Sequence, residues 1–139
     1  MSIHLREPER HDIARAAVID ADAVACSLIA FVEVRSGLAR ARFKDNPARL
    51  DGDGYSKVLA DFQTDWRTYF RIRMSDRLIR QAADLAEKHR LRAYDAIHLA
   101  SALAVRERVP DRILVSTWDR ELADAARAEG LDLAHEVTP

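Results

Sequence analysis

The chain has 139 residues and a formal net charge of −1, with 48% hydrophobic and 32% charged residues. This length and balance are typical of one soluble globular domain that buries its own core. No apolar run approaches the roughly 20 residues that span a bilayer, and the polar start of the chain lacks the pattern of a secretory signal, so we expect a cytoplasmic protein. The near-neutral charge excludes binding of nucleic acid through overall positive charge, but it allows a local basic patch.

Hydrophobic periodicity predicts that helices and strands alternate along the chain. Apolar residues three and four apart indicate helices, and short apolar, β-branched runs indicate strands. Residues 44–54 collect Asn, Pro, Asp and Gly, which predicts a loop. In chain order we expect a helix over 11–20, a strand over 22–27, helices over 28–43 and 55–69, a strand over 70–75, helices over 76–90 and 95–108, a strand over 112–117, a helix over 119–130 and a strand over 131–137.

This alternation indicates an α/β fold in which helices flank a parallel sheet of about four to five strands. Right-handed crossovers bring the helix N-termini that follow the strands to one edge of the sheet. Sheets of this kind bind ligands at that edge, beyond the carboxyl ends of the strands. Functional residues are therefore expected there.

Three acidic residues occupy positions where packing alone would favour another residue. Glu33 interrupts an apolar run, Asp95 lies in the first turn of a mostly apolar helix, and Asp119 directly follows an apolar strand. Each has a structural explanation, since Asp95 and Asp119 are suited to cap helices and Glu33 to face solvent. If the fold is right, however, the three carboxylates converge, and a cation would relieve their repulsion. Such oxygen-rich sites suit Mg²⁺ or Mn²⁺, which promote attack of water on a phosphodiester.

Other residues favour ordinary structural roles. Cys26 is the only cysteine and lies in an apolar run, which suits a small buried side chain. The five histidines contain no zinc-binding pair at helical spacing, and the chain has no glycine-rich phosphate loop. Base stacking is conceivable for Trp66, Tyr69 and Phe70, but their spacing favours the core or a dimer contact.

Three segments resemble the PIN domain family, and most closely its VapC-type ribonuclease toxins of bacterial toxin–antitoxin pairs. The resemblance runs from about residue 6 to the C-terminus, and the segments follow one another in the family's order. It implies a single PIN-like domain over residues 1–139, with an α/β/α sandwich fold, that forms a homodimer. The three segments are LIAFVEVRSGLARAR (28–42), LRAYDAIHLASALA (91–104) and LVSTWDRELADAARAEGL (114–131).

The resemblance implies an endoribonuclease that depends on Mg²⁺ or Mn²⁺ and cleaves RNA. It also implies a cognate antitoxin protein, which occupies the active-site groove and holds the enzyme inactive. By motif position, Glu33, Asp95 and Asp119 are the second, third and fourth acids of the site, and we expect them to be both metal ligands and catalytic residues. The candidate substrate-binding residues are Arg35, which suits bidentate phosphate contacts, and Ser116 and Thr117, one of which matches the hydroxyl residue that accompanies the last acid.

The sequence departs from the family pattern at its start. The family ordinarily begins with a central strand and an Asp-Thr/Ser signature, whose Asp is the first metal ligand, and Asp12, Asp20 and Asp22 fall at the wrong places to replace it. A missing central strand leaves its neighbours without hydrogen-bond partners, and a missing carboxylate weakens the metal site. Three explanations are open: a start codon assigned too far downstream, a truncated copy, or a rearrangement in which residues 1–5 or another chain fill the gap.

This departure puts the activity of the chain in doubt and keeps two alternatives to a ribonuclease. One is a catalytically impaired PIN scaffold that binds an antitoxin or itself without cleavage. The other is a purely helical interaction module, which is disfavoured if residues 112–117 form a strand of a sheet.

Overall fold

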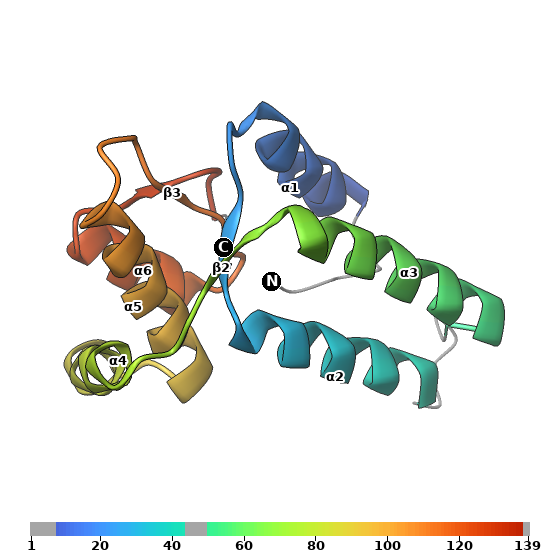
Figure 1. Ribbon diagram of the computed structural model, residues 1–139, viewed down its shortest axis with the longest axis horizontal. Coiled ribbons are helices and arrows are strands. Elements are labelled where there is room, and N and C mark those ends of the chain that lie inside the picture. Colours follow the sequence, from blue (N-terminus) through green and yellow to red (C-terminus); the bar gives the residue numbers. More distant parts are fainter. Residues whose placement is uncertain (1–7, 44–49, 138–139) are drawn as a thin grey trace. The chain divides into compact units, whose positions relative to one another are not determined.

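The computed structural model describes residues 8–43 and 50–137. Contacts divide the chain into two compact units: unit 1 comprises the described parts of Met1–Ala25 and Ile29–Phe70, and unit 2 those of Cys26–Leu28 and Arg71–Pro139. None of the described helices is both long and apolar enough to cross a membrane. In chain order the elements are α1 (Pro8–Asp20), β1 (Ala25–Ser27), α2 (Ile29–Phe43), α3 (Gly52–Thr68), β2 (Phe70–Ile72), α4 (Asp76–His89), α5 (Ala93–Arg106), β3 (Leu114–Val115), α6 (Arg120–Ala128) and β4 (Asp132–Leu133) (Figure 1).

The main packing of unit 1 is that of α2 against α3, which lie side by side (Figure 1). The buried side chains of α2 recur every four residues, at Ala30, Val34 and Leu38. On α3 the buried residues are Phe62 and Trp66, again four apart. Each helix therefore buries one face, as the apolar spacing of both segments predicts.

Helix α3 begins inside the predicted loop, which is a correction to the sequence analysis. Asp51 is the N-cap residue, and its carboxylate Oδ1 accepts the N–H of Gly54 over 2.6 Å. This bond satisfies one of the backbone donors that every helix leaves unpaired at its start, so the Asp-Gly sequence opens a helix instead of extending the loop. The rest of the predicted loop, 44–49, lies outside the described residues.

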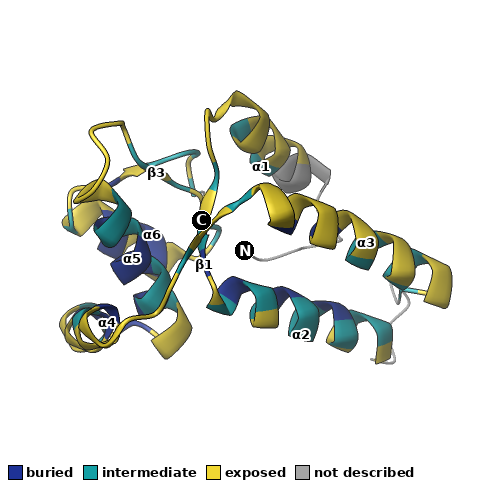
Figure 2. Cartoon of the chain, in the orientation of Figure 1, coloured by how far each residue is buried: buried dark blue, intermediate teal, exposed yellow. Residues whose placement is uncertain are grey.

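Unit 2 holds the larger apolar core. Helices α4 and α5 pack along each other and are joined by residues 90–92, where Arg90 adopts a left-handed conformation with φ of 57°. The buried residues are concentrated on α5 and α6 (Figure 2). On α5, Leu99 is 1% and Ala100 0% exposed. Leu122 of α6 belongs to the same cluster, so α6 closes the core that α4 and α5 begin.

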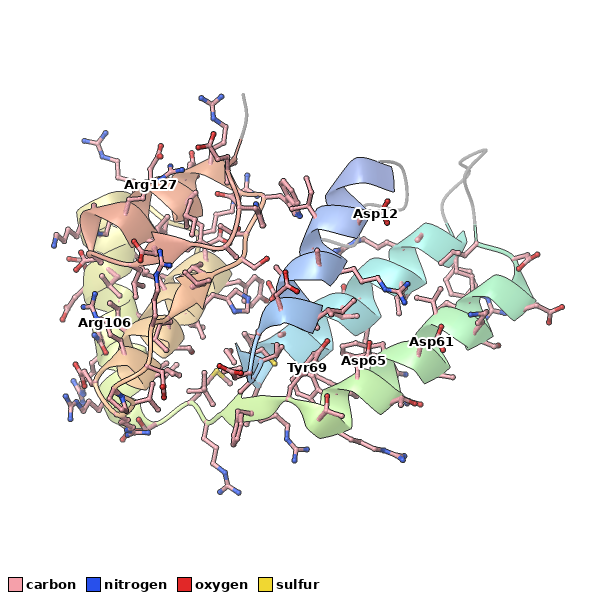
Figure 3. The ribbon with its side chains drawn as sticks, turned by 90° about the horizontal axis from the view of Figure 1, so that it is seen from above. Asp12, Asp61, Asp65, Tyr69, Arg106 and Arg127 are labelled. Atoms are coloured by element: carbon pink, nitrogen blue, oxygen red, sulfur yellow. The ribbon has the colours of Figure 1, made fainter. Side chains whose placement is uncertain are left out.

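Polar contacts hold the C-terminal end of α6 in place. Glu129 Oε1 accepts hydrogen bonds from Lys88 Nζ over 2.7 Å and lies 2.6 Å from His89 Nε2, both at the end of α4. These two hydrogen bonds, and then the positive charges, lower the pKa of the Glu129 carboxyl. From α5, Arg106, labelled in Figure 3, donates to the Glu129 carbonyl oxygen over 2.7 Å. Glu129 thus links three helices.

The strands form two separate two-stranded sheets, β1–β2 and β3–β4. In the second, the strands are parallel and Leu114 lies opposite Asp132. Parallel strands flanked by helices agree with the predicted α/β class, but the single sheet of four to five strands is not formed by the described residues.

Candidate functional site

Asp119 lies at the carboxyl end of the β3 segment and is the N-cap of α6. Its Oδ1 accepts the N–H of Leu122 over 2.9 Å, so the capping role considered for this residue is real. The N–H of Asp119 itself donates to Thr117 Oγ1 over 3.1 Å, which fixes the backbone before the helix. The side chain is exposed, and a carboxylate has a second oxygen with acceptor sites of its own. Capping and metal binding are therefore compatible at Asp119.

Asp95 lies in the first turn of α5 but is not its N-cap. That position belongs to Arg92, which makes no side-chain capping bond. Asp95 is half-buried and stands next to Ala96, which is 1% exposed. A carboxylate in a first turn is favoured by the helix dipole, yet an N-cap function does not account for this residue.

Glu33 and Arg35 lie on α2 of unit 1. Glu33 precedes the buried Val34 and is itself half-buried. Its side chain is therefore not fully exposed to solvent. The Arg35 guanidinium carbon is 5.9 Å from the centre of the Phe31 ring. At this distance the guanidinium is within cation–π range of the Phe31 ring.

Ser116, exposed at the end of β3, contacts a residue that the sequence analysis had set aside. Its Oγ lies 3.2 Å from Nε2 of His135, which follows β4. The His135 ring in turn stacks on Trp118, with 3.9 Å between ring centroids and 20° between planes. The two partners of His135 flank Thr117, so a small polar and aromatic cluster surrounds the predicted hydroxyl residues.

Trp66 lies in the core, as the sequence predicts, whereas Phe70 and Cys26 are less buried. Trp66 is 9% exposed and its ring lies 5.2 Å from that of Phe31 and 5.7 Å from that of Phe62, as expected of the core. Phe70, by contrast, is 68% exposed. Cys26 is only partly buried, whereas a buried side chain was expected, and this burial raises the pKa of its thiol.

The predicted metal ligands are divided between the two units, with Asp95 and Asp119 in unit 2 and Glu33 in unit 1. Within 8–43 and 50–137, no three His, Cys, Asp or Glu side chains are grouped so that they could hold a metal ion. The donor chemistry fits Mg²⁺ or Mn²⁺, because all three predicted ligands are carboxylates. Their convergence stays a prediction.

Comparison with known proteins identifies the family that the three segments resemble. The model of the PIN domain family matches residues 1–128. Two relatives, ribonuclease VapC45 of Mycobacterium tuberculosis strain CDC 1551 / Oshkosh and ribonuclease VapC49 of strain ATCC 25618 / H37Rv, are each 36% identical over 117 residues, which cover 81% of this chain and 74% of the relative. The α/β/α fold class is confirmed by this match. The chain belongs to the PIN domain family, and within it to the VapC branch.

Proposed function

We propose that this chain is a divalent-metal-dependent endoribonuclease, the toxin component of a toxin–antitoxin pair, which hydrolyses RNA phosphodiester bonds. The 36% identity to two ribonucleases over most of the chain supports the reaction class. The structural observation that carries the proposal is the position of Asp119, an exposed carboxylate at the carboxyl end of β3 and the start of α6. This is where α/β proteins place ligand-binding residues.

In this proposal Glu33, Asp95 and Asp119 are the catalytic acids and hold Mg²⁺ or Mn²⁺. A divalent ion held there would supply the positive charge that promotes attack of water on phosphorus. Asp119 is fixed for this task, because the bond from the Leu122 N–H orients its carboxylate. One bond to the carboxylate and one from the Asp119 N–H to Thr117 Oγ1 thus order this ligand before substrate arrives, which reduces the cost of ordering it.

The remaining candidate residues would bind the substrate. Arg35 presents a planar guanidinium that suits bidentate contact with a phosphate. The hydroxyl groups of Ser116 and Thr117 lie within three residues of Asp119 and would donate to phosphate oxygens. The proposed partners are RNA, a cognate antitoxin protein that covers the same site, and a second copy of this chain.

The test is cleavage of single-stranded RNA by the purified full chain in Mg²⁺, with EDTA as the blank. Asp95→Asn and Asp119→Asn are each expected to abolish cleavage while the far-UV circular dichroism spectrum stays unchanged. The matched control is Asp124→Asn, because Asp124 is an exposed acid on α6 whose contact is an ion pair with Arg127 one turn away. Unchanged cleavage in both site variants would refute the assignment.

A catalytically impaired scaffold that binds an antitoxin or itself is the second candidate. Calorimetric titration with Mn²⁺ separates the two functions. A ribonuclease should bind Mn²⁺ and lose that binding in Asp95→Asn, whereas a scaffold should give no binding heat and no cleavage.

A further inference from the structure

An aromatic pair beside Asp119 stands outside the core of unit 2. The rings of Trp118 and His135 stack, with centroids 3.9 Å apart and planes 20° from parallel. Neither residue belongs to the apolar cluster that α4, α5 and α6 bury, and both side chains are half-buried. The pair is therefore partly exposed to solvent.

The position of the His135 ring is fixed by the segment that follows β3 and by its own neighbours in the chain. Its Nε2 lies 3.2 Å from Ser116 Oγ, and its Nδ1 lies 3.4 Å from the Glu136 carbonyl oxygen. The preceding residue is anchored to β3, since the Ala134 N–H donates to the Val115 carbonyl over 2.9 Å. The ring is thus held in place before any ligand binds.

The pair adjoins the proposed catalytic acid directly. Trp118 and Asp119 are consecutive residues, so their Cα atoms are about 3.8 Å apart. A phosphate bound to a divalent ion that Asp119 would help to hold would bring its attached nucleoside close to the stacked rings. Proteins that bind single-stranded nucleic acid stack bases on aromatic side chains of this kind, because every base has a π-face.

We propose that the Trp118–His135 pair is a base-stacking subsite for a nucleotide next to the scissile phosphate. The inference rests on the proposed function, which supplies the RNA substrate. Ser116 acts in it as a positioning residue whose Oγ accepts the His135 Nε2–H, which holds the ring in the stack and leaves the Ser116 hydroxyl hydrogen for a phosphate oxygen. Because a base inside a duplex is already stacked and paired, the subsite favours single-stranded RNA.

Binding is measured on the full chain in EDTA, where cleavage does not interfere. The sequence has two tryptophans, Trp66 and Trp118, so the Trp66→Phe variant leaves Trp118 as the sole indole fluorophore. A mixed-sequence single-stranded RNA should quench this fluorescence, and the same sequence as a duplex should bind at least about tenfold more weakly. If Trp66→Phe fails to fold, the wild-type chain labelled with 5-fluorotryptophan gives two ¹⁹F signals, and the one missing in Trp118→Phe reports on the pair.

Variants at His135 separate stacking from general disruption. His135→Ala should weaken single-stranded RNA binding about tenfold or more, while His135→Phe, which keeps a ring against Trp118, should restore most of it. The neighbouring exposed residue provides the control, and Glu136→Ala should bind as the wild type does. Near-UV circular dichroism checks that each variant is folded.

The inference and the proposed function fail separately. An unchanged Trp118 signal, equal binding of duplex and single strand, or wild-type affinity in His135→Ala overturns the subsite even if the chain cleaves RNA. Loss of binding that His135→Phe does not restore also overturns it. A wild-type chain that shows this stacking but cleaves no RNA in Mg²⁺ supports the stacking surface and refutes the nuclease. Quenching by an antitoxin-like peptide but not by RNA would assign the surface to a protein partner and overturn the inference.

Discussion

Asp119 and Leu122 share the hydrogen bond that opens α6, in which the Leu122 N–H donates to Asp119 Oδ1 over 2.9 Å. The acid proposed to bind metal is therefore also a structural residue. Asn is as good an N-cap as Asp, whereas Ala is not. The choice of substitution consequently decides whether a mutation tests chemistry or stability.

Asp119→Asn should abolish RNA cleavage with little change in the free energy of unfolding. Asp119→Ala should abolish cleavage and also destabilise the chain by about 1 kcal/mol, because the Leu122 N–H loses its acceptor. Urea denaturation followed by circular dichroism measures the difference. Equal stability of the two variants would show that the cap contributes nothing.

Mn²⁺ should stabilise the folded chain through the proposed ligands. An ion that binds only the folded state adds about 2.7 kcal/mol when present at 100 times its Kd. The thermal unfolding midpoint should therefore rise with Mn²⁺ in the wild type and in Asp124→Asn, but not in Asp95→Asn. A rise of the same size in Asp95→Asn would place the bound ion elsewhere.

The contacts of Glu129 predict a loss of stability in acid. Hydrogen bonds from Lys88 and His89 lower the pKa of Glu129 from its ordinary value of 4.5. A carboxyl whose pKa is lower in the folded state stabilises the protein fully above the unfolded value, and this contribution is lost as pH falls through the folded value. The stabilisation by Glu129 should therefore be complete above about pH 5 and decline below pH 4.5.

Glu129→Gln provides the comparison, because Gln keeps an acceptor oxygen but does not titrate. Urea denaturation from pH 7 to pH 3.5 should show the wild type more stable at neutral pH and the gap closing below pH 4.5. A gap that stays constant over this range would mean that the charge of Glu129 does not contribute.

Two glycines at the start of α3 should respond oppositely to alanine. A Cβ at Gly54 would lie 2.9 Å from Asp51 Oδ1, whereas a Cβ at Gly52 would meet nothing within 4 Å. Gly52→Ala should stabilise the chain by about 0.5–1 kcal/mol through the better helix propensity of Ala. Gly54→Ala should lose that gain, because the capping carboxylate must move. Thermal unfolding of the two variants side by side is the measurement, and equal shifts would refute the argument.

Local patterns predicted the helices well. The spacing of apolar residues placed a helix over 76–90, and α4 spans Asp76–His89. Strands were predicted too long, since the apolar run 112–117 forms a strand only at Leu114–Val115. An apolar run indicates that a segment is buried. Whether it pairs as a strand depends on a neighbouring strand with free backbone groups, and that strand lies far away in the sequence.

The candidate site rests on signals that are local in the sequence. Glu33, Asp95 and Asp119 are predicted because each breaks a local pattern and matches a family segment, and their role stays a prediction. The contact of Ser116 with His135 spans 19 residues, and no periodicity marks it. His135 was set aside because histidines were examined for spacing along the chain, whereas its partners reach it only through the pairing of β3 and β4.

The sequence alone determined most of the helices, the α/β class and the family, and it is also the basis on which the three acids are proposed. These depend on residue types within a few turns of helix or on short motifs, which are readable along the chain. Only the tertiary structure decided that the strands form two separate pairs, that Asp119 caps α6, and that Trp118 and His135 stack. The strand pairing and the ring stacking join residues that lie far apart in the sequence and are brought together only when the whole chain packs.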